Sequence, residues 1–249
     1  MDQYQALLDA ADELCIVIGV TGAAWLNATR ADPGAIDDLV TAYGRGVTQG
    51  SWVSVARKAA KAATTSSGAP HALTAFARKP TKSWLAQLDE LTKERNNAAH
   101  GMRPRSQAQA AERLDTLVPS LETALRGASY LGELPWILTT SSSYRAHDRT
   151  FDVAARLVMG DHPEFEPSRW KVTLPLENDR VYLIPDGREP IDMTPFIVVR
   201  NCEVCRSPEL FHSDRRPGEG GTILKNAAGH GGPLADHSLD EEFRRLQGG

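Results

Sequence analysis

Residues 81–101 read TKSWLAQLDELTKERNNAAHG, and this stretch decides the fold class of the first half of the chain. Its apolar residues recur at the spacing of one helix face: Trp84, Leu85, Leu88 and Leu91. Thr81 or Ser83 can cap the start, because a hydroxyl there accepts from a free backbone N–H group. Gly101 is a common helix terminator, and Pro104 follows it. The sequence therefore predicts one amphipathic helix that runs to His100.

The same periodicity predicts helices on both sides of this segment. They cover residues 2–17, 32–43, 52–63, 73–77 and 106–131. The stretch DPG at 32–34 is a helix start, Ser51 is expected to cap the third helix, and Pro119 predicts a kink in the last. Residues 64–70 form a loop by composition, so the first half is expected to be a helical bundle.

From Gly132 onward the pattern changes to short β-rich runs, at 136–140, 151–159, 170–174, 181–184, 196–199 and 221–224. Turn-forming stretches separate them, at 160–163, 185–187 and 216–221. The expected class is α+β, with an all-α bundle first and a mostly antiparallel β domain after it. The expected boundaries are 1–131 for the bundle, 132–235 for the β domain and 236–249 for a short C-terminal helix and tail.

Composition narrows the class of protein. The chain has 249 residues, of which 41% are hydrophobic and 24% charged, as in ordinary soluble proteins. The sequence has no run of 18 apolar residues, so no membrane span is predicted. The first residues do not resemble a signal peptide. Three cysteines, two of them in a Cys-x2-Cys, do not form a disulfide framework. A cytoplasmic location is therefore expected.

Charge is unevenly distributed along the chain. The net charge is −4, yet residues 45–105 carry eleven Lys and Arg against three acids, which makes this block +8. A basic block inside an acidic chain predicts an anionic partner such as RNA, although a solvated helix face has the same composition. The residues predicted to bind RNA are Arg57, Lys58, Lys61, Lys93, Arg103 and Arg105.

Arg95 and His100 form an Arg-x4-His pair at the end of the amphipathic helix, with Asn96 directly after the arginine. Asn96 precedes His100 by four residues, so these two share a helix face. An imidazole titrates near neutral pH and can act as general base or acid, while a guanidinium can hold a phosphate with two hydrogen bonds. The alternative is a plain helix end, where a histidine interacts well with the helix dipole.

Residues 94–101, ERNNAAHG, resemble the signature of the HEPN family of small α-helical domains. That signature is an arginine, usually a polar residue, three variable residues and a histidine. The helices before and after the motif are also similar, so the resemblance covers about residues 1–131. Some HEPN toxins have a tyrosine two residues after the histidine; this chain has Met102 there, so regulation through such a tyrosine is not expected.

The resemblance implies a metal-independent endoribonuclease without a cofactor, acting as a toxin or anti-phage defence effector. It implies that His100 moves protons as an RNA 2′-hydroxyl attacks the neighbouring phosphate, that Arg95 stabilises charge and that Asn96 orients the histidine or the phosphate. It also implies a homodimer in which two motifs meet, and an antitoxin or defence-system partner. Two other functions stay open: a non-catalytic module that binds RNA or dimerises, and a sensor or adaptor led by the β domain.

Cys202-Glu203-Val204-Cys205 has the spacing of half a zinc knuckle. The candidates to complete a structural zinc site are the histidines that follow it, His212, His230 and His237. The alternative is a metal-free tight turn between strands, and a redox role would need a βαβ setting that the sequence does not predict. The stretch GEGG at 218–221 is predicted to be a hairpin loop.

Overall fold

The computed structural model describes residues 2–66, 69–78, 81–158, 165–185, 189–227, 229 and 231–247, with only the backbone of 75, 76, 78, 81–83, 219 and 247. The expected turn at 160–163, residues 186 and 187 of the expected turn at 185–187, the side chains of Thr81 and Ser83, and His230 lie outside this description. Helices come first and antiparallel sheets follow, which confirms the α+β class.

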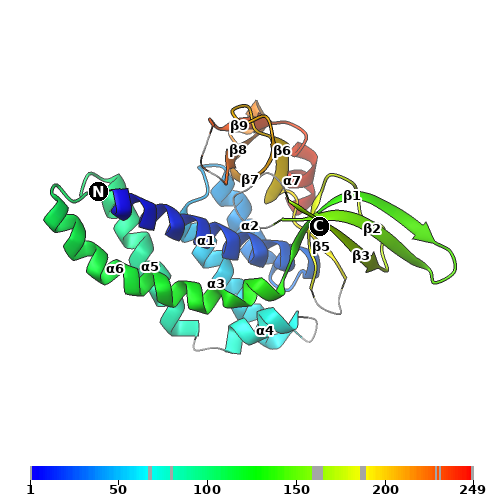
Figure 1. The fold of residues 1–249 in the computed structure, drawn as a ribbon, viewed down its shortest axis with the longest axis horizontal. Helices are drawn as coiled ribbons and strands as arrows, with labels where there is room; N and C mark the ends of the chain where they lie inside the picture. The colour runs from blue at the N-terminus through cyan, green and yellow to red at the C-terminus, as the bar shows by residue number, and fades with distance from the viewer. Residues whose placement is uncertain are drawn as a thin grey trace.

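The helical half consists of α1 (Asp2–Thr29), α2 (Pro33–Tyr43), α3 (Gln49–Thr65), α4 (His71–Arg78), α5 (Thr81–Ala99) and α6 (Gln107–Gly127), followed by the 3-10 turn η1 (Ala128–Glu133). Figure 1 shows these helices packed together, with α1 and α6 running side by side. None of the described helices is both long and apolar enough to cross a bilayer.

Helix α1 continues well beyond the predicted end at residue 17. Its second half packs closely on α3, because glycines remove the side chains that would keep the two helices apart. A Cβ on Gly19 would lie 2.7 Å from Trp52, and one on Gly22 would lie 3.0 Å from Ala59. The residue numbers in these two contacts increase along both helices, so α1 and α3 run roughly parallel. The short prediction was wrong because glycine lowers helix propensity, and here tertiary packing outweighs that preference.

Side-chain caps position the next two helices. The Asp32 carboxylate accepts from the Ala35 N–H at 3.1 Å and starts α2, as predicted. Thr48, and not Ser51, caps α3. The Thr48 hydroxyl accepts from the Ser51 N–H at 3.2 Å, and the Ser51 hydroxyl accepts from the Thr48 N–H. The predicted cap was therefore three residues late, because Ser51 is the third helical residue of a capping box.

Helices α5 and α6 form an antiparallel pair. At one end Gly127 lies against Trp84, and at the other Glu94 contacts Arg113. The Ser106 hydroxyl caps α6 by accepting from the Gln109 N–H, and Pro119 lies inside this helix. The helical end expected at Leu131 is a 3-10 turn from Ala128 onward.

The β half consists of two antiparallel sheets. The first has the order β3-β2-β1-β4-β5, from β1 (Trp136–Arg145), β2 (Thr150–Leu157), β3 (Glu166–Val172), β4 (Val181–Leu183) and β5 (Ile191–Asp192). The second has the order β6-β7-β8-β9, from β6 (Ile197–Asn201), β7 (Pro208–Arg215), β8 (Thr222–Asn226) and β9 (Leu234–Asp236). In Figure 1 the β1–β3 arm extends away from the helices, whereas the second sheet lies beside α2.

Three of these strands were not predicted: β5, β7 and β9. Strand β7 is central in its sheet yet polar in sequence, and its buried residues include His212, Ser213 and Asp214. A strand made of such residues shows no apolar alternation. The predicted hairpin loop at 218–221 is confirmed, since it joins the antiparallel strands β7 and β8 through a 3-10 turn.

The helices and the second sheet share one hydrophobic core. The C-terminal helix α7 (Asp240–Gln247) brings Phe243 against Tyr43 of α2, with ring centroids 4.8 Å apart. The Tyr43 carbonyl accepts from the Arg216 N–H at 2.7 Å, and the Val47 N–H donates to the Asp214 carbonyl at 2.7 Å. These contacts place the second sheet against the helices, so a cleft between them is part of the fold.

Candidate functional site

The Arg-x4-His motif lies at the C-terminal end of α5. Gly101 has φ of +84°, the left-handed conformation that ends many helices. The Met102 N–H then donates to the Asn97 carbonyl at 2.9 Å, and the Gly101 N–H to the Ala98 carbonyl at 3.3 Å. This closed turn leaves the side chain of His100 exposed. Its backbone N–H donates to the Asn96 carbonyl at 3.0 Å, so the expected i, i+4 relation holds.

Arg95 and His100 do not point in the same direction. Residues five apart on an α-helix are separated by about 140° around its axis. Arg95 is half-buried on the side of α1, where its positive charge acts to lower the pKa of Asp12. Burial of Asp12 outweighs this effect, so the pKa of that carboxyl is raised overall. Asn96, by contrast, is exposed like His100.

A half-buried network lies next to the motif, and the sequence alone does not reveal it. Glu94, directly before Arg95, accepts from the Tyr4 hydroxyl at 2.5 Å and from Arg113 at 2.5 Å. This carboxylate thereby ties α1, α5 and α6 together at the motif. Burial and the bond to Glu94 raise the pKa of Tyr4. No local pattern predicts this contact, because Tyr4 and Glu94 are 90 residues apart in sequence.

Half of the predicted RNA-binding residues lie at the motif. Lys93, Arg103 and Arg105 line a groove of about 890 Å³ between α5 and α6. Arg103 donates to the Ala98 carbonyl at 3.3 Å, which holds its guanidinium against the helix end. Among the described residues no carboxylate forms an ion pair with these three cations. The groove is not uniformly basic, since Glu90, Glu94 and Glu112 also line it.

The other half of the predicted RNA-binding residues lies elsewhere. Arg57 forms an ion pair with Asp89 and donates to the Leu85 carbonyl, and Lys58 forms an ion pair with Asp38. Asp89 precedes His100 by eleven residues, which is about 16 Å along a helix. Lys61 follows one turn further along α3, away from the motif. The structure therefore does not gather the six cations into one patch.

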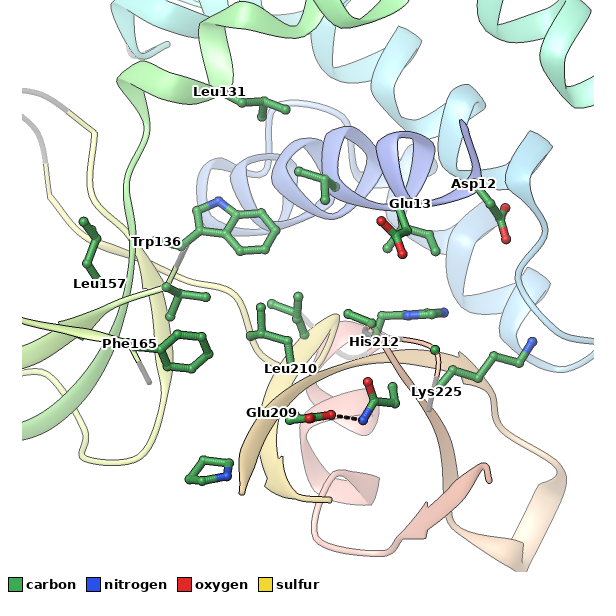
Figure 2. A pocket seen from close by; sticks show the side chains of 18 of the residues that line it. Asp12, Glu13, Leu131, Trp136, Leu157, Phe165, Glu209, Leu210, His212 and Lys225 are labelled. Atoms are coloured by element: carbon green, nitrogen blue, oxygen red, sulfur yellow. Dashed lines mark hydrogen bonds between the residues drawn. The ribbon is translucent and has the colours of Figure 1, made fainter. Parts of the chain in front are cut away.

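A second candidate site is a cleft of about 940 Å³ between α1 and the second sheet. Figure 2 shows Asp12 and Glu13 of α1 facing Glu209, His212 and Lys225, while Trp136 and Phe165 line the other end. Burial lowers the pKa of His212 to about 4, so this imidazole is neutral at physiological pH. This site is not evident from the sequence, because its residues come from segments separated by nearly 200 positions.

The Cys202-x2-Cys205 segment is a turn between β6 and β7, as predicted. Donor atoms of Cys202, Cys205 and Glu209 all lie within 4.8 Å of one another. Two of the histidines named as possible ligands are not in this group: His212 lines the cleft, and His237 contacts Asp240 at 3.5 Å. The Cys205 thiol donates to Glu209 at 3.0 Å, and this bond raises the pKa of Cys205, which does not favour a reactive thiolate.

Neither the family models nor the curated proteins nor the solved structures with which the chain was compared gave a significant match.

Proposed function

We propose that the end of α5 is an RNA-cleaving site and that the protein is a metal-independent endoribonuclease of the HEPN type. One observation carries this proposal: the side chain of His100 is exposed at the turn that ends α5, and the groove that includes the next residue, Gly101, is lined by the cations Lys93, Arg103 and Arg105. An RNA phosphate bound by these cations can therefore reach this imidazole, a side chain that can act as general base or acid.

The chemistry needs little beyond these groups. The 2′-oxygen of a ribose attacks the adjacent phosphorus, the bond to the 5′-oxygen breaks, and a cyclic phosphate and a free 5′-hydroxyl result. In the proposed reaction His100 takes the proton from the 2′-hydroxyl or gives one to the leaving 5′-oxygen. Arg103 and Arg105 bind the phosphate backbone, and Arg95 stabilises the charge on the reacting phosphate. Asn96, exposed one turn before His100, orients the imidazole or the phosphate.

The proposed active form is a homodimer. Arg95 and His100 diverge within one chain, so a phosphate at His100 would meet an Arg95 supplied by a second copy. Exposed apolar side chains support such a pairing: Met102 (53% exposed) follows the motif, and Val118 (41%) and Leu125 (51%) share a face of α6. Light scattering after gel filtration should give twice the chain mass for the wild type, and a monomer for Leu125→Glu.

The cleavage experiment uses purified full-length chain, total RNA and an excess of EDTA. We expect His100→Ala to lower the cleavage rate by about 100-fold or more, as for loss of a general acid or base. Arg95→Ala should lower it by a similar factor. His147→Ala is the matched control, because His147 is an exposed histidine in the β1–β2 turn, outside the helical half. Equal rates for wild type and His100→Ala, or a requirement for added metal, would refute the proposal.

The same experiment separates catalysis from binding alone. A non-catalytic RNA-binding module would bind RNA without cutting it, and Arg103→Ala would weaken binding in a salt-dependent manner.

A growth assay then tests the proposed role as a cytoplasmic toxin or defence effector. Expression of the wild type should stop growth, expression of His100→Ala should not, and a neutralising partner protein should restore growth.

The cleft supports a second role, in which the β half senses a small molecule. Its volume of about 940 Å³ lies within the range of small-molecule sites, and apolar residues dominate its lining. Leu210→Trp would fill this space from β7. In a thermal-shift screen of metabolite-sized molecules, a ligand of the cleft should stabilise the wild type and leave Leu210→Trp unaffected.

A further inference from the structure

The turn between β6 and β7 presents the Cys202 sulfur to a backbone donor. The Val204 N–H donates to Cys202 Sγ at 3.4 Å, and the Arg206 N–H to the Cys202 carbonyl at 3.0 Å. Arg206 has φ of +61°, so the chain turns sharply directly after the second cysteine. The Cys202 N–H bonds to the Ser207 carbonyl at 2.9 Å and closes the loop. Hydrogen bonds to sulfur stabilise a thiolate, the form in which cysteine binds metals.

A carboxylate completes this group of donors. Glu209, near the start of β7, is only 5% exposed, and its two oxygens contact the Cys205 thiol and the Asn226 amide. Burying a carboxylate costs free energy unless it is hydrogen-bonded, paired or bound to a metal. The Asn226 amide, on β8, orients Glu209 in the way that second-layer hydrogen bonds orient metal ligands.

The spacing of the three donor atoms suits a tetrahedral ion. Zinc binds sulfur at about 2.3 Å and carboxylate oxygen at about 2.1 Å, which puts ligand atoms about 3.6–3.8 Å apart. Here the Cys205 sulfur and the Glu209 oxygen are 3.0 Å apart, and all three donors lie within 4.8 Å. Side-chain movements of about 1 Å would reach the ideal geometry.

We propose that Cys202, Cys205 and Glu209 bind a zinc ion, with a water molecule in the fourth position. Two thiolates select a soft or borderline ion over Mg²⁺ or Ca²⁺, which prefer oxygen ligands. The ion would tie the β6–β7 turn to the body of β7. Because Glu209 also lines the cleft, the metal centre lies at the edge of that cleft. This inference does not depend on RNA cleavage, since the α5 end and the cysteine turn share no residue.

The test measures metal bound to the full chain after expression in zinc-supplemented medium and purification without chelator. Elemental analysis should give about one zinc per chain for the wild type and little for Cys202→Ser/Cys205→Ser. Cys15→Ser is the matched control, because Cys15 is a buried cysteine of α1 outside the group, and it should keep the metal. A metal-free wild type, or equal loss in Cys15→Ser, would overturn the proposal.

A cobalt titration keeps the test decisive if the double variant does not fold. The metal-free, reduced wild type should develop thiolate-to-cobalt charge-transfer absorption together with the intense visible bands of tetrahedral cobalt. Glu209→Gln should weaken zinc binding at least about tenfold in competition with a chelator dye. Glu203→Gln, an exposed glutamate in the same turn, should bind like the wild type. Absence of charge transfer in the reduced chain would contradict a thiolate site, and unchanged affinity in Glu209→Gln would contradict the three-donor site.

Discussion

Protonation of His212 should weaken the fold as the pH falls. This imidazole is 8% exposed on the central strand β7, and its Nδ1 has no hydrogen-bond partner among the described residues. Burial disfavours the charged imidazole, and the ammonium group of Lys225 acts in the same direction. Together they outweigh the carboxylate of Asp214, which favours the charged form, and they lower the pKa to about 4. The unfolded chain would restore the ordinary value of 6.5.

The magnitude follows from this difference. Between pH 6.5 and about 4 the unfolded state takes up a proton that the folded state does not. The free energy of unfolding therefore falls as the pH is lowered through this window, and His212 contributes no further change below it. A shift of one pKa unit corresponds to about 1.4 kcal/mol, so the expected loss between pH 7.5 and 4.5 is about 2.5 kcal/mol.

Urea unfolding, followed by tryptophan fluorescence at pH 7.5 and 4.5, measures this loss. Other groups titrate in the same range. Asp12 has the opposite sign, because a raised carboxyl pKa lets the folded state take up its proton first and so favours the folded chain as the pH falls. The quantity to compare is therefore the difference between wild type and His212→Gln, which lacks the titrating ring. His147→Gln, an exposed histidine, serves as control and should keep the wild-type pH dependence. Equal losses of free energy in wild type and His212→Gln, within about 0.5 kcal/mol, would contradict the lowered pKa of His212 in the folded chain.

Two further predictions concern the packing that holds the helices in place. Gly19→Ala should destabilise the fold by about 1–3 kcal/mol in urea unfolding, since the new methyl group would lie 2.7 Å from Trp52; Gly34→Ala, which meets only ordinary contacts, should change it far less. Leu88→Ala should cost about 2–5 kcal/mol, because this side chain of α5 is fully buried, whereas Leu174→Ala, at an exposed position of the β half, should stay within about 0.5 kcal/mol of the wild type. Similar losses in Leu88→Ala and Leu174→Ala would contradict the assigned burial.

The helices of the first half were predictable because their residues carry a local signal. The apolar stripe of Trp84, Leu85, Leu88 and Leu91 is buried as predicted, and Gly101 ends α5 in the left-handed conformation. Periodicity and helix ends depend on neighbours within about one turn, so they can be read along the chain. The errors came where distant packing decides. Helix α1 passes through Gly19 and Gly22 only because α3 lies against them.

The candidate sites show the same difference between features that depend on local sequence and features that depend on distant packing. The position of His100, exposed one turn after Asn96, follows from the helix and its terminator. The surroundings of Arg95 do not follow from the helix and its terminator, because Asp12 of α1 comes beside Arg95 only in the folded chain. Likewise Arg57 and Lys58 are part of the basic block in sequence, yet in space they lie with Asp89 and Asp38, away from His100.

By itself the sequence determined the α+β class, the helix that carries the motif and the turn that carries two cysteines, since each depends on residues close together in the chain. Only the tertiary structure decided that Glu209 joins Cys202 and Cys205, that Glu94 ties three helices together beside Arg95, and that α1 and β7 enclose a cleft. The physical reason is that these groups meet through strand register and helix packing over long sequence separations, and such contacts leave no periodic pattern in the chain.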